Sequence, residues 1–323
     1  MPSRDSLSAM WTVEDLHGAA TVTVDGSVAV EAAGGPATPA TRFQVASVGK
    51  QFAAAAMLLL AERGALALEQ PVTRWLPGGR PWWRDVTLHH LLTHTSGLDH
   101  WGEAPGFDLY APLELAERVD LIQQASPESR PGVHWRYSSP GYLLVARIVE
   151  QAAGQAYGPF LAEQIFAPLG LESTTTGPPT DPAADVAKGH RDGRPVTEGP
   201  LPPLPGTSDV WSTVGDLARY AERFHAGALL GAESRAVMTG PLAPTASEPK
   251  PGRSFFGSHY GYGLYVGTVA GHTAYFHPGD IPGFASFHAW LPDRRASITV
   301  LSGDETTDLG ATVTQLITAA ALS

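Results

Sequence analysis

The sequence predicts an α/β fold of the α+β type, in which helices flank an antiparallel sheet that is built from both chain ends. Three observations predict it. Alternation of apolar and polar residues marks strands near the start of the chain and again near its end, a long apolar run follows the first strands, and helical periodicity fills the middle. We expect a sheet domain of residues 1–75 and 207–323 and an inserted, mainly helical domain of residues 76–206.

The strands come first and last. Residues 21–24 and 28–30 form a hairpin around Asp25-Gly26, a typical two-residue turn. At the other end, alternation predicts antiparallel strands over residues 262–268, 272–277, 284–291 and 297–302, and a closing helix over residues 306–321.

Helices fill the part between. The first is expected over residues 47–63, which hold alanines, leucines and Met57 without an interior proline, and Gly64 is well placed to end it. Further helices are expected over residues 112–125, 140–153, 157–167 and 213–227. Two proline-rich stretches interrupt them, at 177–206 and 241–252, and such long loops are usually functional lids or disordered tips.

Composition excludes several classes of function. A formal net charge of -11 disfavours nucleic acid and anionic membranes as partners, and no stretch reaches the roughly 20 apolar residues of a membrane span. The absence of cysteine excludes disulfides, thiol catalysis and thiolate metal sites. Residues 1–11 show no export signal, so we expect a cytoplasmic location, although a trimmed leader would leave the same sequence.

Lysine is scarce, and one lysine occupies a suggestive position. The chain has eighteen arginines but only Lys50, Lys188 and Lys250. Arginine never releases its proton, whereas a buried lysine amine can do so and act as a base. Lys50 follows Ser47 by three residues at the start of the long apolar run, so both side chains lie on one helix face, where the helix N-terminus favours an oxyanion. Such an amine can activate a serine hydroxyl, although the spacing also suits an ordinary lysine of the first helical turn.

Spacing alone does not select Ser47. Ser247 and Lys250 are separated in the same way, but Pro249 and Pro251 exclude a helix there and no apolar run follows to bury the amine. The surrounding sequence therefore favours Ser47 as the nucleophile.

Three further segments carry a resemblance to a known family. Residues 131–144 (PGVHWRYSSPGYLL) place Ser139 two positions after Tyr137, residues 91–98 read LLTHTSGL, and residues 277–284 read HPGDIPGF. In this order they resemble motifs of class C β-lactamase-like and penicillin-binding-protein-type serine hydrolases, in the esterase branch. The last segment looks like the family's Lys/His-x-Gly strand. Shorter matches keep the same order from about residue 18 to residue 302.

The resemblance implies a serine β-lactamase/DD-peptidase-like fold with the active site between the two domains. It implies that Ser47 forms a covalent acyl-enzyme, with Lys50 and Tyr137 sharing the proton transfer and either of them as the base. The implied oxyanion hole consists of the backbone N–H groups of Ser47 and Asp280. Ser139, His277 and Gly279 are the implied substrate-binding residues. No cofactor or metal is implied.

Two departures from the family pattern guide the choice of substrate. Ser139 stands where asparagine is common and offers fewer hydrogen-bond donors, which disfavours β-lactam turnover. His277 replaces a lysine, and histidine is largely neutral at pH 7, so a fixed charge for a substrate carboxylate is lost. We therefore expect a carboxylesterase-like hydrolase or an acyltransferase acting on small esters or uncharged amides. The alternatives are a β-lactamase or D-amino acid peptidase or amidase and, more remotely, a catalytically silent ligand-binding homologue.

Other residues have simpler interpretations. His90 and His94 have the i, i+4 spacing of a metal pair, but no Glu follows His90, so we expect a structural role for His94 and no metal site. Packing, rather than an acyl pocket, is expected for the three tryptophans Trp82, Trp83 and Trp101. The sequence leaves the oligomeric state open.

Overall fold

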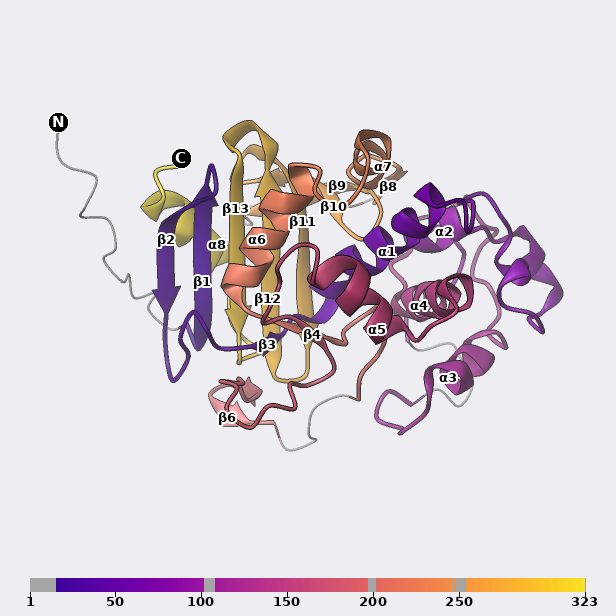
Figure 1. The fold of residues 1–323 in the computed structure, drawn as a ribbon, viewed down its shortest axis with the longest axis horizontal. Coiled ribbons are helices and arrows are strands. Elements are labelled where there is room, and N and C mark those ends of the chain that lie inside the picture. The colour runs from indigo at the N-terminus through magenta and orange to yellow at the C-terminus, as the bar shows by residue number, and fades with distance from the viewer. Residues whose placement is uncertain (1–15, 102–107, 197–201, 246, 248–253, 323) are drawn as a thin grey trace.

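The computed structural model describes residues 16–101, 108–196, 202–245, 247 and 254–322. An antiparallel eight-stranded sheet has the strand order β2-β1-β13-β12-β11-β10-β9-β8 (Figure 1). Its strands are β1 (Gly18–Val24), β2 (Ser27–Ala33), β8 (Ala243–Pro244), β9 (Phe255–Tyr260), β10 (Tyr265–Val269), β11 (His272–Ile281), β12 (Phe284–Leu291) and β13 (Ala296–Ser302). Because β1 pairs with β13, the prediction that both chain ends share one sheet is confirmed. The domain boundaries at residues 75 and 206 stay a prediction.

Turn chemistry explains the first hairpin, and local sequence explains where the strand predictions were wrong. Asp25 and Gly26 have φ values of 48° and 74°, as a two-residue hairpin turn with two left-handed residues requires. β9 was not predicted, because its residues do not alternate in burial. β10 begins at residue 265 rather than 262, since Gly263 turns the chain with a φ of 73°.

The two faces of the sheet pack into separate hydrophobic clusters. Ala19 and Leu301 belong to one cluster, whereas their strand neighbours Ala20 and Val300 belong to the other. Helix α6 (Val214–His225) covers the first face and helix α8 (Leu309–Ala319) covers the second (Figure 1). This alternation is the period-two pattern that predicted the strands.

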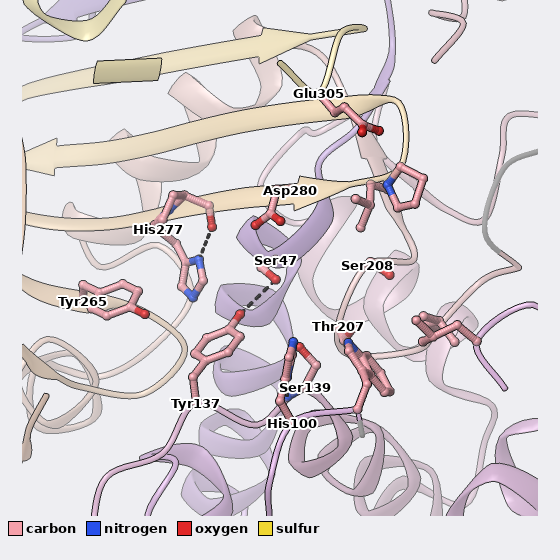
Figure 2. Close-up of a pocket in the computed structure, with 16 residues that line it drawn as sticks. Ser47, His100, Tyr137, Ser139, Thr207, Ser208, Tyr265, His277, Asp280 and Glu305 are labelled. Atoms are coloured by element: carbon pink, nitrogen blue, oxygen red, sulfur yellow. Dashed lines mark hydrogen bonds between the residues drawn. The ribbon is translucent and has the colours of Figure 1, made fainter. Parts of the chain in front are cut away.

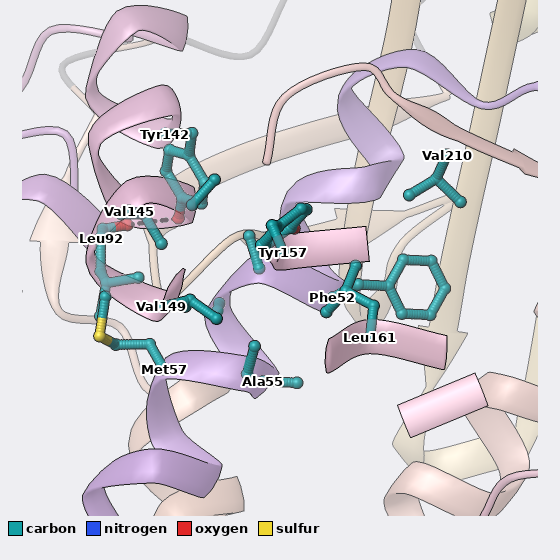
Figure 3. Close-up of a cluster of buried hydrophobic side chains, with 14 of the residues drawn as sticks. Phe52, Ala55, Met57, Leu92, Tyr142, Val145, Val149, Tyr157, Leu161 and Val210 are labelled. Carbon is teal, nitrogen blue, oxygen red and sulfur yellow. Dashed lines mark hydrogen bonds between the residues drawn. The ribbon is translucent and has the colours of Figure 1, made fainter. Parts of the chain in front are cut away.

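Helix α1 (Lys50–Glu62) crosses the interior between the sheet and the other helices. Every residue from Lys50 to Leu60 is buried, as expected of a helix that is apolar on all sides. Figure 3 shows Phe52, Ala55 and Met57 of α1 in one cluster with side chains of α4 and α5. The other helices are α2 (Leu88–Leu92), α3 (Leu115–Ile122), α4 (Ser139–Ala153), α5 (Tyr157–Leu161) and α7 (Ala232–Met238). Shorter helical turns are η1 (Ala46–Gly49), η2 (Val72–Arg74), η3 (Pro81–Asp85), η4 (Ala162–Phe166) and η5 (Pro292–Arg294).

Several helix predictions need adjustment at their ends. The helix expected over residues 47–63 is divided into the 3-10 turn η1 and the α-helix α1, and Gly64 ends it with a φ of 72°. The helix expected over 112–125 is limited to α3, and the second half of the one expected over 157–167 forms the π-helical turn η4. The short helices α2 and α7 were not predicted, because one or two turns carry too little periodicity.

The two proline-rich stretches lie near the sheet. The first contains the hairpin of β5 (His190–Arg191) and β6 (Arg194–Pro195). The His190 N–H donates to the Gly303 carbonyl at 2.8 Å and the Gly193 N–H to Asp304 Oδ2 at 2.7 Å, so this hairpin is fixed to the end of β13. The second stretch contains β8, whereas Lys250 lies outside the described residues. Among the described helices, none is both long enough and apolar enough to span a bilayer.

Candidate active site

Ser47 lies in the 3-10 turn η1, immediately before α1, and not in the α-helix where it was predicted. In a 3-10 helix, side chains three residues apart eclipse one another. The turn therefore places Lys50 Nζ 2.9 Å from Ser47 Oγ. The i, i+3 relation that the sequence suggested is realised through a tighter helix than expected.

The residue before Ser47 has an unusual backbone. Ala46 has a φ of 49°, a left-handed conformation that is uncommon for residues other than glycine. Its neighbour Val45 is held on both sides, since its N–H donates to the Val210 carbonyl at 2.9 Å and its carbonyl accepts from Ser286 Oγ at 2.8 Å. Ser47 is thus supported by β12 and by β7 (Val210–Ser212), which lies in a small sheet with β3 (Phe43–Gln44) and β4 (Thr175–Thr176). Nothing in the sequence signals this turn, because alanine has no left-handed preference.

The Lys50 amine is buried and contacts two hydroxyl groups and an aromatic ring. Besides Ser47 Oγ, its Nζ donates to Ser139 Oγ at 3.2 Å, and it lies 5.0 Å from the centre of the Tyr137 ring. Burial lowers the pKa of Lys50 to about 7, and the carboxylates of Asp280 and Asp209 oppose this shift. A substantial fraction of Lys50 is therefore a neutral amine near pH 7 and can accept a proton.

Tyr137 approaches the same serine from the other side of the cleft. Its hydroxyl donates to Ser47 Oγ at 2.9 Å (Figure 2). Burial raises the pKa of Tyr137 well above its ordinary value, and hydrogen bonds with Ser47 and Ser139 only partly oppose the shift. The hydroxyl is therefore a proton donor at neutral pH and not a phenolate.

His94 holds the backbone on both sides of Tyr137. Its carbonyl accepts the Arg136 N–H at 2.8 Å, its Nδ1 accepts the Ser138 N–H at 3.1 Å, and its ring lies 4.5 Å from the Tyr137 ring. Burial lowers the pKa of His94 far below its ordinary value, so the ring is neutral, and the Ser138 N–H selects the tautomer in which Nδ1 is the acceptor. His94 is thus a packed residue that positions Tyr137, in agreement with its expected structural role.

Ser139 and His100 complete this side of the cleft. The Ser139 N–H donates to His100 Nδ1 at 3.2 Å. His100 and the next residue, Trp101, both line the cleft. Packing was predicted for Trp101, and the ring does pack against the main hydrophobic cluster, but it also lines the cleft. In contrast, Trp82 and Trp83 stack on each other at 4.2 Å and do not line the cleft.

His277 lines the cleft as a neutral ring. Its Nδ1 donates to the Pro278 carbonyl at 2.5 Å, so its Nε2 accepts from the Tyr260 hydroxyl, at 3.0 Å. Burial, with a smaller contribution from the charge of Lys50, lowers the pKa of His277 to about 3. His277 therefore offers no positive charge to a substrate near neutral pH.

Gly279 allows β11 to pass close to the serine turn. A Cβ at this position would lie 2.4 Å from Ser286 Oγ and 2.8 Å from the Val45 carbonyl oxygen. Pro278 and Asp280 line the cleft, whereas Gly279 is buried beneath it. Its observed contribution is this close approach.

The pairing register places the Asp280 N–H on the open edge of the sheet. Ile281 pairs with Phe284 across a two-residue turn, and this pair is the hydrogen-bonded one in such hairpins. Asp280 belongs to the next, non-hydrogen-bonded pair, so its N–H points away from β12. On that side β10 pairs with β11 only as far as Phe276, and Pro278, which has no N–H, occupies the equivalent position. The N–H of Asp280 is therefore available to a ligand beside η1.

These residues surround a cleft of about 680 Å³ (Figure 2). Ser47, Tyr137 and His277 line it, and Trp101, Leu109, Leu204 and Ile281 add apolar surface to its wall. The cleft can hold an acyl group of moderate size next to the Ser47 hydroxyl, which both Lys50 and Tyr137 contact.

Asp209 is a buried acid near this centre that the sequence did not single out. Its Oδ1 accepts the Gly206 N–H at 3.0 Å. Burial raises the pKa of Asp209 to about 7, and the charge of Lys50 opposes the shift. The residue follows a proline-rich stretch and belongs to no recognisable motif, so only the fold reveals its electrostatic coupling with Lys50.

The histidines of α2 have other partners. His89 Nδ1 lies 2.8 Å from the Tyr262 hydroxyl, and His90 Nδ1 accepts the Thr87 N–H at 3.1 Å. Across the residues that the structure describes, no three His, Cys, Asp or Glu side chains are arranged to hold a metal ion.

Comparisons with known proteins identify the family. A family model described as β-lactamase matches residues 9–322. Esterase EstB of Burkholderia gladioli is 40% identical over 156 residues, 43% of this chain and 39% of that protein. Penicillin-binding protein 4* of Bacillus subtilis is 38% identical over 138 residues, 41% of this chain and 30% of that protein. Each match spans well under two thirds of the relative's length.

Solved structures share the fold. The octameric penicillin-binding protein homologue from Pyrococcus abyssi has a TM-score of 0.79 at 26% identity, covering 95% of this chain and 73% of that one. The D-amino acid amidase from Ochrobactrum anthropi SV3 has a TM-score of 0.80 at 21% identity, covering 95% and 93%, and shows the fold alone. With the family model matching nearly the whole chain, the protein belongs to the β-lactamase family.

Proposed function

We propose that this protein is a carboxylesterase-like hydrolase or acyltransferase that opens small esters or amides through an acyl-enzyme on Ser47. One observation carries the proposal. Ser47 Oγ lies 2.9 Å from both Lys50 Nζ and the Tyr137 hydroxyl, so a nucleophile, a base and an acid meet at one atom.

The pKa directions favour Lys50 as the base. The neutral amine takes the Ser47 proton while Oγ forms a bond to the acyl carbon, and the carbonyl electrons move to oxygen. The backbone N–H groups of Ser47 and Asp280 bind this oxyanion. When the carbonyl re-forms, the bond to the leaving group breaks, and the leaving group takes a proton through Tyr137, which Lys50 re-protonates. Water or another acceptor then repeats the sequence in reverse and releases the acyl group.

The cleft supports acyl donors that lack a carboxylate. His277 is neutral and has partners for both ring nitrogens, so a substrate carboxylate finds no fixed cation there. Ser139 presents a short hydroxyl that is already in contact with Lys50. The partial match to esterase EstB is consistent with an ester substrate.

A second candidate is hydrolysis of D-amino acid amides or of β-lactams. The same three residues can open an amide, and D-alanyl-D-alanine-carboxypeptidase/endopeptidase AmpH of Escherichia coli matches 64% of this chain at 27% identity. Turnover of p-nitrophenyl butyrate faster than that of nitrocefin supports the esterase assignment, and the reverse order favours the β-lactamase one.

An activity-based phosphonate probe tests the nucleophile. We expect one mass adduct on the native protein and none on Ser47→Ala. The matched control is Ser247→Ala, which removes the other serine that precedes a lysine by three residues and should be labelled like the native protein. Persistent labelling of Ser47→Ala contradicts the assignment, and a native protein that neither labels nor turns over esters is a silent homologue.

A cytoplasmic location also stays a proposal. It rests on residues 1–11, which lie outside the described residues. Fractionation of the source cells, with an antibody against the protein, tests it.

A further inference from the structure

We propose that the Asp280 carboxylate selects substrates that carry an ammonium group close to the scissile bond. The inference rests on the proposed function, because it assumes that Ser47 is acylated in this cleft. It replaces the uncharged substrate expected from the sequence with a cationic one.

Of the described residues, two carboxylates line the cleft, and they differ in their partners. Glu305 accepts the Gly283 N–H at 2.5 Å and pairs with Arg191, so its charge already stabilises the fold around β12. The Asp280 carboxylate is exposed and makes no hydrogen bond or ion pair with any residue in the described parts of the chain. Of these two described carboxylates, that of Asp280 is therefore the one without a protein partner.

Asp280 also lies close enough to Ser47 to interact with a charge on a bound substrate. Figure 2 shows its carboxylate beside Ser47, on the strand whose edge N–H faces the serine turn. Of the two carboxylates that raise the pKa of Lys50, Asp280 has the larger effect. A group attached within a few bonds of the scissile carbonyl lies within the same range.

Among the described residues that line the cleft, no positive side chain opposes this carboxylate. Its described lining contains no lysine or arginine, and the ring of His277 is neutral. Lys50, beneath the cleft, contacts Ser47 and Ser139 and is partly neutral near pH 7. A substrate carboxylate is therefore repelled, whereas an ammonium group is attracted by Asp280.

Aromatic rings add to the preference for a cation. Tyr265 and Trp101 line the same cleft, and the faces of such rings attract ammonium groups. The same rings give no advantage to an anion. Charge and ring placement thus point to one substrate class, esters or amides that carry an ammonium or quaternary ammonium group.

Three p-nitrophenyl esters of similar length test the charge on the acyl side. They are those of 4-(trimethylammonio)butyrate, butyrate and succinate, which are cationic, neutral and anionic. We expect kcat/KM of the cationic ester to exceed that of the neutral ester about fivefold, and the anionic ester to be slowest, in line with an exposed charge pair. A second comparison, of butyrylthiocholine with the neutral S-butyl thiobutyrate, places the positive charge in the leaving group. The two comparisons together show whether Asp280 favours a charge on the acyl side or on the leaving-group side.

Variants assign the effect to Asp280. In Asp280→Asn the cationic and neutral esters should be used equally, and in Asp280→Lys the anionic ester should become the better substrate. Glu305→Gln removes the other cleft carboxylate, and Asp25→Asn makes the same charge change in the distant hairpin turn. Both controls should keep the native preference.

A measurement on the native protein avoids dependence on folding of the variants. The preference for the cationic ester should weaken as salt rises from about 0.02 to 0.5 M, because the Debye length shortens. Equal use of both cationic substrates and their neutral partners at low salt overturns the inference but leaves the proposed function intact. Failure to turn over any ester, together with no phosphonate adduct on Ser47, overturns the proposed function and the inference with it.

Discussion

Lys50 Nζ lies 2.9 Å from Ser47 Oγ, and the lysine side chain that makes this contact is fully buried. The contact joins the first residue of α1 to the 3-10 turn η1 that precedes this helix. Burial lowers the pKa of Lys50 to about 7, so the amine can lose its proton where an arginine never would.

Replacing this amine tests whether its proton or its charge is needed. Lys50→Arg keeps the positive charge, but the guanidinium cannot act as a base. We expect kcat/KM for p-nitrophenyl butyrate to fall by about 10²–10⁴-fold in Lys50→Arg and by a similar factor in Lys50→Ala. Near-native activity of Lys50→Arg would show that charge alone suffices.

The pH dependence of kcat/KM should report the same group. Activity should rise as Lys50 loses its proton, with a midpoint near its pKa of about 7, and should show no fall from Tyr137 ionisation at moderately alkaline pH. Asp209→Asn should move the midpoint to lower pH, because the Asp209 carboxylate raises the pKa of Lys50. A midpoint that Asp209→Asn leaves in place, or moves upward, contradicts this assignment.

His94 should affect the rate through the position of Tyr137. His94→Ala removes the acceptor of the Ser138 N–H, and we expect kcat to fall about tenfold with little change in KM, since a small misplacement of an acid lowers the rate. His94→Asn should restore most of the rate, because its amide oxygen replaces Nδ1 and asparagine tolerates the φ of 59°. Equal losses in the two variants, matched by equal losses in thermal stability, would indicate packing alone.

Gly279 should tolerate no side chain. The Cβ of Gly279→Ala would lie 2.4 Å from Ser286 Oγ, so β11 must move away from η1 and take the Asp280 N–H with it. We expect kcat to fall by about 10²–10³-fold, the usual loss when an oxyanion donor is misplaced. Ser286→Ala combined with Gly279→Ala removes the closest contact and should recover part of the rate. No rate loss in Gly279→Ala would show that the strand does not position the donor.

Stability in acid should depend on buried neutral histidines. His288 is buried, its Nδ1 lies 2.9 Å from Thr299 Oγ1, and burial lowers its pKa to about 4. Between about pH 6.5 and that value the unfolded chain binds a proton that the folded protein does not, so the free energy of unfolding falls as pH falls through this window. Urea titrations at several pH values give the slope of the unfolding free energy against pH. In His288→Gln this slope should be smaller by up to about 1.4 kcal/mol per pH unit. An unchanged slope would mean that the folded His288 binds its proton like an exposed histidine.

Much of the fold could be predicted because turns and helix ends depend on the residues that form them. Asp25-Gly26 meets the backbone needs of a hairpin turn, and Gly64 those of a helix end. The order of short motifs around Ser47, Tyr137 and His277 indicated the family. By contrast, β9 and α7 were missed because their partners in the sheet and core, rather than their own periodicity, hold them in place.

The sequence by itself determined which residue types are present and the order in which they occur, including a serine, a lysine and a tyrosine in family register. Tertiary structure alone decided what they can do. The surroundings of Lys50 set its pKa, burial keeps His277 neutral, and the Asp280 carboxylate on β11 has no hydrogen-bond or ion-pair partner among the described residues. Each depends on desolvation and on charges brought close from distant parts of the chain, which no local pattern of residues records.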